Sequence, residues 1–155
     1  MKIIQKHFQF IEPFEPLENV QNIIVHHTSR KHMTAEECHE FHQKKRGWSG
    51  IGYNYFIEKS GEIIEGRGQH MGAHAYGYNR TSIGICMTGD FDIELPTNEQ
   101  WTSLLWLSGY MMKLYNLQPD QVLGHRELDG VKKTCPGRLI NMDEVRQQVR
   151  EYIQK

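Results

Sequence analysis

The sequence predicts a single α/β domain in which helices flank a mixed central β-sheet. Short β-branched and apolar runs, typical of buried strands, alternate along the chain with amphipathic segments that begin at helix-capping residues. The 155 residues suffice for one substantial hydrophobic core and leave no room for a second binding module. We expect residues 1–22, which contain Pro13 and Pro16, to be an extended lead-in, and residues 23–155 to form the domain itself.

Four segments are predicted to be strands. Residues 23–25 and 82–89 are apolar runs expected in the middle of the sheet, and Cys86 within the second run should be buried and inert. Residues 53–57 and 62–65 lie on either side of Ser60-Gly61 and should form a hairpin. The glycine-rich and aromatic residues 66–79 are predicted to be a long loop that forms one wall of a groove.

Three helices are predicted, and each begins at a side chain that can cap its first turn. The capping residues are Thr34, Thr97 and Asn141. The first two are followed three residues later by Glu37 and Gln100, which completes a capping box, and their helices should end near residues 46 and 116. The buried stripe of the last helix is expected to consist of Val145, Val149 and Ile153.

Cys38 and His42 lie four residues apart on the first helix and could share a metal ion. Their sequence context is not a His-Glu-x-x-His motif, and Cys38 fits an apolar stripe. Since buried free cysteine is common, core packing of Cys38 beside a solvated His42 is the preferred interpretation.

Composition excludes several classes of protein. The net charge of -1 argues against a protein that mainly binds nucleic acid, and three cysteines without framework spacing argue against a disulfide-stapled secreted scaffold. No segment has the apolar core of a secretory signal or the roughly 20 apolar residues of a membrane span. We therefore expect synthesis and folding in the cytoplasm, with no membrane insertion. The nine histidines favour metal or proton-transfer chemistry.

Half of a metal site is predicted within residues 122–137. His125 and Cys135 lie on one short loop, where Gly130 and Pro136 allow the chain to fold back so that both side chains point at one ion. A surface loop with an unrelated histidine and cysteine is the alternative, because a two-ligand pattern is weak by itself.

A third ligand is available from His26 or His27, at the carboxyl end of the strand over residues 23–25. Adjacent strand residues face opposite sides of a sheet, so only one of the two can face the site. Two imidazoles and one thiolate would leave the fourth position of a zinc ion open, as in catalytic zinc centres. Tyr53 could then orient a water there, and Lys133 could stabilise a developing oxyanion.

Five motifs, in order along the chain, carry a resemblance to a known family. They are Ile-Val-His-His-Thr (24–28), Gly-Trp-Ser-Gly-Ile-Gly-Tyr-Asn-Tyr (47–55), Gly-Ala-His-Ala-Tyr-Gly-Tyr-Asn (72–79), Ser-Ile-Gly-Ile-Cys (82–86), and His-Arg-Glu (125–127) followed by Lys-Thr-Cys-Pro (133–136). Together they resemble the zinc-dependent N-acetylmuramoyl-L-alanine amidases of type 2, the family that includes small phage endolysins and the peptidoglycan recognition proteins.

The resemblance implies one Zn2+ per chain, held by His26, His125 and Cys135. His26 is chosen over His27 because it directly follows the valine of the first strand, as the ligand of the family does. Cysteine as the third ligand is similar to the endolysins and recognition proteins, and differs from the cytoplasmic recycling amidases, which typically use aspartate.

The resemblance also implies roles around the ion. Tyr53 would lie near the zinc-bound water, and Lys133 would support the transition state. Lys132 is an alternative to Lys133, because the loop between the late ligands is longer than expected for the shortest phage enzymes. His74 is expected in the substrate groove, and His27 and Asn79 are further candidates for substrate binding.

The implied activity is hydrolysis of the amide between N-acetylmuramic acid and L-alanine in peptidoglycan. We expect a monomeric endolysin or autolysin that acts on the cell wall after release from the cytoplasm. One alternative is a recognition module that binds peptidoglycan without cleaving it, for which loss of a ligand would be the signature. The other is a phage amidase that also regulates a protein partner, about which the sequence says nothing.

Overall fold

The computed structural model describes residues 1–155 and has a six-stranded mixed sheet at its centre, in the order β1-β4-β3-β5-β2-β6. The strands are β1 (Ile3–Gln5), β2 (Asn22–His27), β3 (Tyr55–Ile57), β4 (Ile63–Glu65), β5 (Ser82–Met87) and β6 (Val122–Gly124). The hairpin pair β3–β4 is antiparallel, and every other neighbouring pair is parallel. The sheet is therefore mixed, as predicted.

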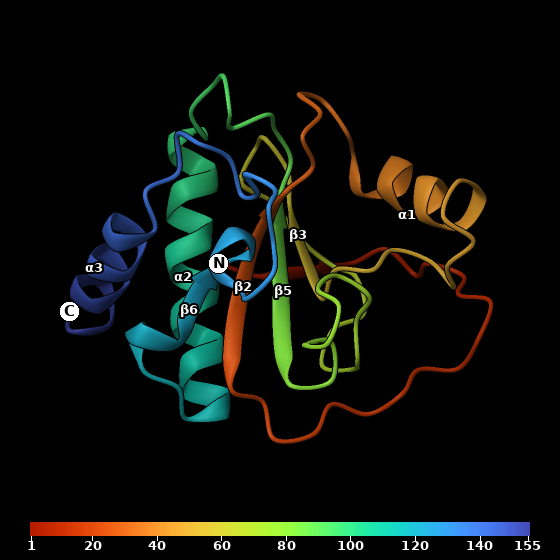
Figure 1. Cartoon of the computed structure of the whole chain (residues 1–155), viewed down its shortest axis with the longest axis horizontal. Helices are drawn as coiled ribbons and strands as arrows, with labels where there is room; N and C mark the ends of the chain where they lie inside the picture. Colours follow the sequence, from red (N-terminus) through yellow and green to blue (C-terminus); the bar gives the residue numbers. More distant parts are fainter.

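Helices cover both faces of the sheet (Figure 1). α1 (Ala35–Lys44) lies on one side, whereas α2 (Asn98–Tyr115) and α3 (Met142–Ile153) lie together on the other. Two short 3-10 turns, η1 (Pro119–Gln121) and η2 (His125–Glu127), flank β6. No helix is both long enough and apolar enough to cross a membrane.

The predicted helix starts are confirmed. Thr34 and Thr97 accept hydrogen bonds from the amides of Glu37 and Gln100 in complete capping boxes, and Asn141 caps α3. These bonds satisfy amides that the first turn of a helix leaves without a partner. Each helix therefore begins where its side chains dictate.

Alternation along β2 determines which of its residues face the site. Ile23 and Val25 pack into the large core beneath α2 and α3, whereas Ile24 packs in a separate cluster with Ala75 and Leu128. His26, two residues after Ile24, shares the side of the sheet that Ile24 faces, because strand side chains alternate with a period of two. This alternation places the side chains of His26 and His27 on opposite faces of the sheet.

Some predictions for the elements were incomplete or wrong. The N-terminal residues are extended as expected, but β1 within them pairs with β4 as an unpredicted edge strand, and β6 was treated only as an apolar segment. Ile153 is 44% exposed, so the buried stripe of α3 ends at Val149. His42 is buried and not solvated, because its Nδ1 accepts a hydrogen bond from the Gly52 amide at 2.9 Å.

Candidate active site

Two histidines meet at the carboxyl ends of two neighbouring parallel strands. In the register of β2 and β6, Val25 lies opposite Gly124, so the residues that follow, His26 and His125, lie side by side. Their ring centroids are 4.6 Å apart. A Cβ on Gly124 would lie 2.8 Å from the side chain of Met142, so glycine permits the close packing that supports this strand end.

The loop that carries Cys135 is held by Arg126. The Arg126 amide donates to the Cys135 carbonyl at 2.8 Å, and its guanidinium donates to the carbonyls of Thr134 and Gly137 at 3.1 and 2.6 Å and to that of Ile140. One side chain therefore satisfies three carbonyls of an irregular segment, which fixes the loop next to the strand ends.

His26, His125 and Cys135 form the predicted cluster. Their potential ligand atoms all lie within 4.8 Å of one another, and Cys135 Sγ is 3.7 Å from His26 Nδ1. A tetrahedral zinc ion separates its ligand atoms by about 3.5 Å, so the spacing suits it, and imidazole and thiolate are ligands that zinc prefers. The residues therefore fit a zinc ion with three protein ligands.

Burial sets the protonation states of the cluster residues. Burial, followed by neighbouring histidines, holds the pKa of His26 well below its ordinary value, and burial with Lys133 lowers the pKa of His125. Both imidazoles are thus neutral, which is the form that binds metals. Burial raises the pKa of Cys135 to about 12, so a thiolate at this position requires a bound cation.

Tyr53 borders a cavity of about 190 Å3 that is also lined by the three cluster residues. Its ring centroid is 5.3 Å from that of His26 and 5.5 Å from that of His42. Burial, reinforced by nearby cysteines, raises the pKa of Tyr53 well above its ordinary value. The phenol therefore keeps its proton.

A larger groove of about 680 Å3 adjoins this cavity. Lys133 lines both spaces, whereas Lys132 lines only the groove. The geometry therefore favours Lys133 over Lys132 as the lysine next to the metal cluster. Arg46 and Trp48 also line both spaces. The volume of the groove is within the range of about 300–1,000 Å3 that is typical of ligand sites.

His74 and Asn79 lie on the predicted groove wall, but their contacts are mostly internal. His74 is 9% exposed, and its Nδ1 lies 2.8 Å from Nε2 of His26. Asn79 Oδ1 accepts from the amides of His74 and Ala75 at 2.8 and 2.9 Å. Both residues border the groove, and both also hold its wall in place.

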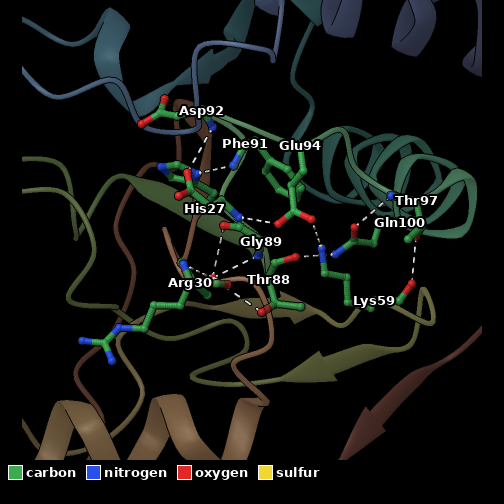
Figure 2. A network of polar contacts seen from close by, with 12 residues as sticks. His27, Arg30, Lys59, Thr88, Gly89, Phe91, Asp92, Glu94, Thr97 and Gln100 are labelled. Atoms are coloured by element: carbon green, nitrogen blue, oxygen red, sulfur yellow. Dashed lines mark hydrogen bonds and ion pairs between the residues drawn. The ribbon is translucent and has the colours of Figure 1, made fainter.

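His27 faces away from the metal cluster, although it borders the cavity. Figure 2 shows it beneath the loop after β5, where its Nδ1 accepts from the Phe91 amide at 3.1 Å. Its Nε2 lies 3.0 Å from Ser29 Oγ. Both ring nitrogens of His27 are therefore engaged within the protein.

The site also includes residues that were not predicted, among them His42, Arg46, Trp48 and Arg126. The first three border the cavity, and Arg126 holds the Cys135 loop. Trp48 carried a usable signal, since a tryptophan in a glycine-rich connector has no periodic place in a helix or strand. Arg126 lies within the His-Arg-Glu motif, but its hydrogen bonds to the carbonyls of Thr134 and Gly137 depend on tertiary structure, so the motif did not indicate this role.

A mixed sheet that carries a two-histidine, one-cysteine cluster at its strand ends, open to a groove, defines an α/β protein with a candidate metal site. The chain belongs to the N-acetylmuramoyl-L-alanine amidase family (Amidase_2), whose sequence model matches residues 16–138. The N-acetylmuramoyl-L-alanine amidase of Homo sapiens is 33% identical over 131 residues, or 74% of this chain and 22% of the human protein. The chain thus spans about a fifth of that relative.

Solved structures of the same family share the fold. The N-acetylmuramoyl-L-alanine amidase LysC from Clostridium intestinale URNW matches with a TM-score of 0.89 and 34% identity, over 97% of this chain and 98% of LysC. Peptidoglycan recognition protein-LE in complex with tracheal cytotoxin, a monomeric diaminopimelic acid-type peptidoglycan, matches with a TM-score of 0.81 and 28% identity, over 94% of this chain and 92% of that chain. Both amidases and recognition proteins are therefore similar to this chain.

Proposed function

We propose that this protein is a zinc-dependent N-acetylmuramoyl-L-alanine amidase that hydrolyses the amide between N-acetylmuramic acid and L-alanine in peptidoglycan. The observation that carries the proposal is the convergence of His26, His125 and Cys135, whose ligand atoms lie within 4.8 Å of one another beside an open groove. A binding module has no chemical need for a complete three-ligand set, so this set favours cleavage over recognition alone.

A zinc ion held by these residues would supply Lewis acidity and a nucleophile at neutral pH. Tyr53 lines the cavity with its phenol protonated, so it would donate a hydrogen bond to the reacting groups and orient them. Lys133 presents a positive charge toward the oxyanion that develops on the scissile carbonyl. The groove bounded by Trp48, His74 and Lys132 accommodates the muramoyl peptide.

The decisive experiment incubates the purified chain with cell walls and measures two kinds of new chain end. We expect new L-alanine amino termini without new reducing sugar ends. The matched control is Cys38→Ala, which removes a buried thiol 1% exposed in the α1 core, whereas Cys135→Ala removes a ligand and should abolish release.

Two results would contradict the proposal. Reducing ends without amino termini would indicate a glycosidase. Binding of the chain to cell walls without any new ends, from protein loaded with zinc, would indicate a recognition module.

A further inference from the structure

A chain of hydrogen bonds leads from a backbone carbonyl to the back of the ligand His26. Ser82 Oγ donates to the Tyr78 carbonyl at 2.6 Å and lies 3.3 Å from His74 Nε2. His74 Nδ1 in turn lies 2.8 Å from His26 Nε2. The other ring nitrogen of His26, Nδ1, lies 3.7 Å from Cys135 Sγ. Four groups are thus connected in one line that ends at the metal cluster.

The direction of this chain follows from the number of protons. The hydroxyl of Ser82 has one proton, and the carbonyl of Tyr78 can only accept, so Ser82 donates its proton to that carbonyl. Ser82 Oγ must then accept from His74, which places the ring proton of His74 on Nε2. In the opposite tautomer, two lone pairs would face each other in a buried site, at a cost in free energy.

The same logic fixes the state of His26. His26 Nε2 and His74 Nδ1 lie 2.8 Å apart, so only one of these two nitrogens can carry the proton between them, and the ring proton of His74 is already on Nε2. His74 Nδ1 has no proton and accepts, so the proton of His26 is on Nε2. The lone pair of His26 Nδ1 is therefore left free on the side that faces His125 and Cys135.

We propose that Ser82 and His74 are positioning residues that fix the tautomer and ring orientation of His26, so that its Nδ1 is always presented to the metal ion. His74 therefore acts through His26, in addition to forming the groove wall. The inference rests on the zinc site of the proposed function.

The packing around His74 supports this role. A Cβ on Gly84 would lie 2.5 Å from His74 Cγ, so the ring lies directly on the backbone of β5. The Asn79 side chain holds the backbone of His74 by accepting a hydrogen bond from the His74 amide. The backbone of His74 is thus held by Asn79, and the face of its ring packs against Gly84. Partners of this kind, behind a metal ligand, typically influence metal affinity by about 10- to 100-fold.

The first test reads the tautomers directly. Long-range 1H–15N NMR spectra of the histidine rings are recorded on the protein as purified and after removal of zinc. We expect the Nε2–H form for both His26 and His74. An Nδ1–H form of either ring in the wild-type protein would overturn the proposal.

The second test measures zinc affinity by competition with a chromogenic chelator. Ser82→Ala removes only the hydroxyl and should weaken zinc binding about 10-fold and mix the tautomers of His74. Ser103→Ala is the matched control, because Ser103 is also a buried serine that donates to a carbonyl, that of Gly61, at 2.5 Å, and it lies on α2. It should lose similar stability and keep wild-type affinity.

The outcomes separate this inference from the proposed function. Wild-type zinc affinity in Ser82→Ala would overturn the positioning role while leaving the zinc site intact. A wild-type chain that binds no zinc would overturn the zinc site and with it the positioning role of Ser82 and His74, whatever tautomers the rings show.

Discussion

Arg146 of α3 binds the carboxylate of Glu127 through both guanidinium nitrogens, at 2.8 and 2.9 Å. The same carboxylate accepts the Gly124 amide at 2.8 Å, at the strand end from which His125 projects. The two side chains are only 16% and 30% exposed, so solvent screens the pair weakly. This ion pair therefore joins the last helix to the segment that carries a metal ligand.

Arg146→Met should lower the free energy of unfolding by about 2 kcal/mol, because the partly buried carboxylate would lose a charged donor. Urea denaturation monitored by circular dichroism measures the change. Arg150→Met is the matched control: Arg150 pairs with Asp120 at 3.2 Å with exposures of 40% and 85%, so its loss should cost about 0–1 kcal/mol. Equal losses in the two variants would contradict the importance of the Glu127 pair.

The contribution of this pair should depend on pH. Burial alone would raise the pKa of Glu127, but the hydrogen bonds from Arg146 and the Gly124 amide outweigh it, and the pKa lies below its ordinary value. A depressed pKa stabilises the folded state above the unfolded value of about 4.3, and this stabilisation is lost as pH falls through the folded pKa. The stability difference between wild type and Arg146→Met should therefore be largest near neutrality and shrink in acid. A difference that grows in acid would refute this sign.

Cys135→Ala should reduce bound zinc to well under one ion per chain, because two imidazoles alone hold zinc poorly. Metal content after gel filtration, measured by inductively coupled plasma mass spectrometry, gives the stoichiometry. Cys86→Ala removes a fully buried thiol on the neighbouring strand and should retain one zinc per chain. Stoichiometric zinc in Cys135→Ala would mean that the ligand set is wrong.

Local patterns along the chain predicted most of the secondary structure. The starts of α1 and α2 were predictable because Thr34 and Thr97 satisfy amides within their own first turns. The separation of His26 from His27 was predictable because side chains alternate along a strand. β1 was not predicted, because its pairing with β4 is a long-range contact that no local pattern marks, whereas β3 and β4 flank the turn residues Ser60 and Gly61.

The residues of the site divide in the same way. The resemblance of five motifs indicated the three cluster residues and Tyr53, and it assigned His74 to the groove alone. The contact between His74 and His26 joins residues 48 positions apart, and no local rule predicts it. The burial of His42 was missed for a related reason, since the amide that it accepts from belongs to Gly52 in the following connector.

Tyr53→Phe should lower kcat by about 100- to 1,000-fold with little change in zinc content, because the substitution removes one donor from the cavity and leaves the ring in place. Because the pKa of Tyr53 is raised, its phenol stays protonated, so the rate should show no alkaline limb from tyrosine ionisation near its ordinary pKa of about 10. Release of L-alanine amino termini from cell walls provides the rate. Wild-type kcat in Tyr53→Phe would remove Tyr53 from the mechanism.

Substitutions of the two adjacent lysines should change different kinetic parameters. Lys133 borders the cavity of the metal cluster, so Lys133→Met should lower kcat about 100-fold through loss of charge near the oxyanion. Lys132 borders only the groove, so Lys132→Met should mainly raise KM for a soluble muramoyl peptide and leave kcat near wild type. Each variant is the control for the other, since both remove one exposed positive charge from the same loop. The reverse assignment, with kcat lost in Lys132→Met and retained in Lys133→Met, would show that Lys132 is the group near the reacting carbonyl.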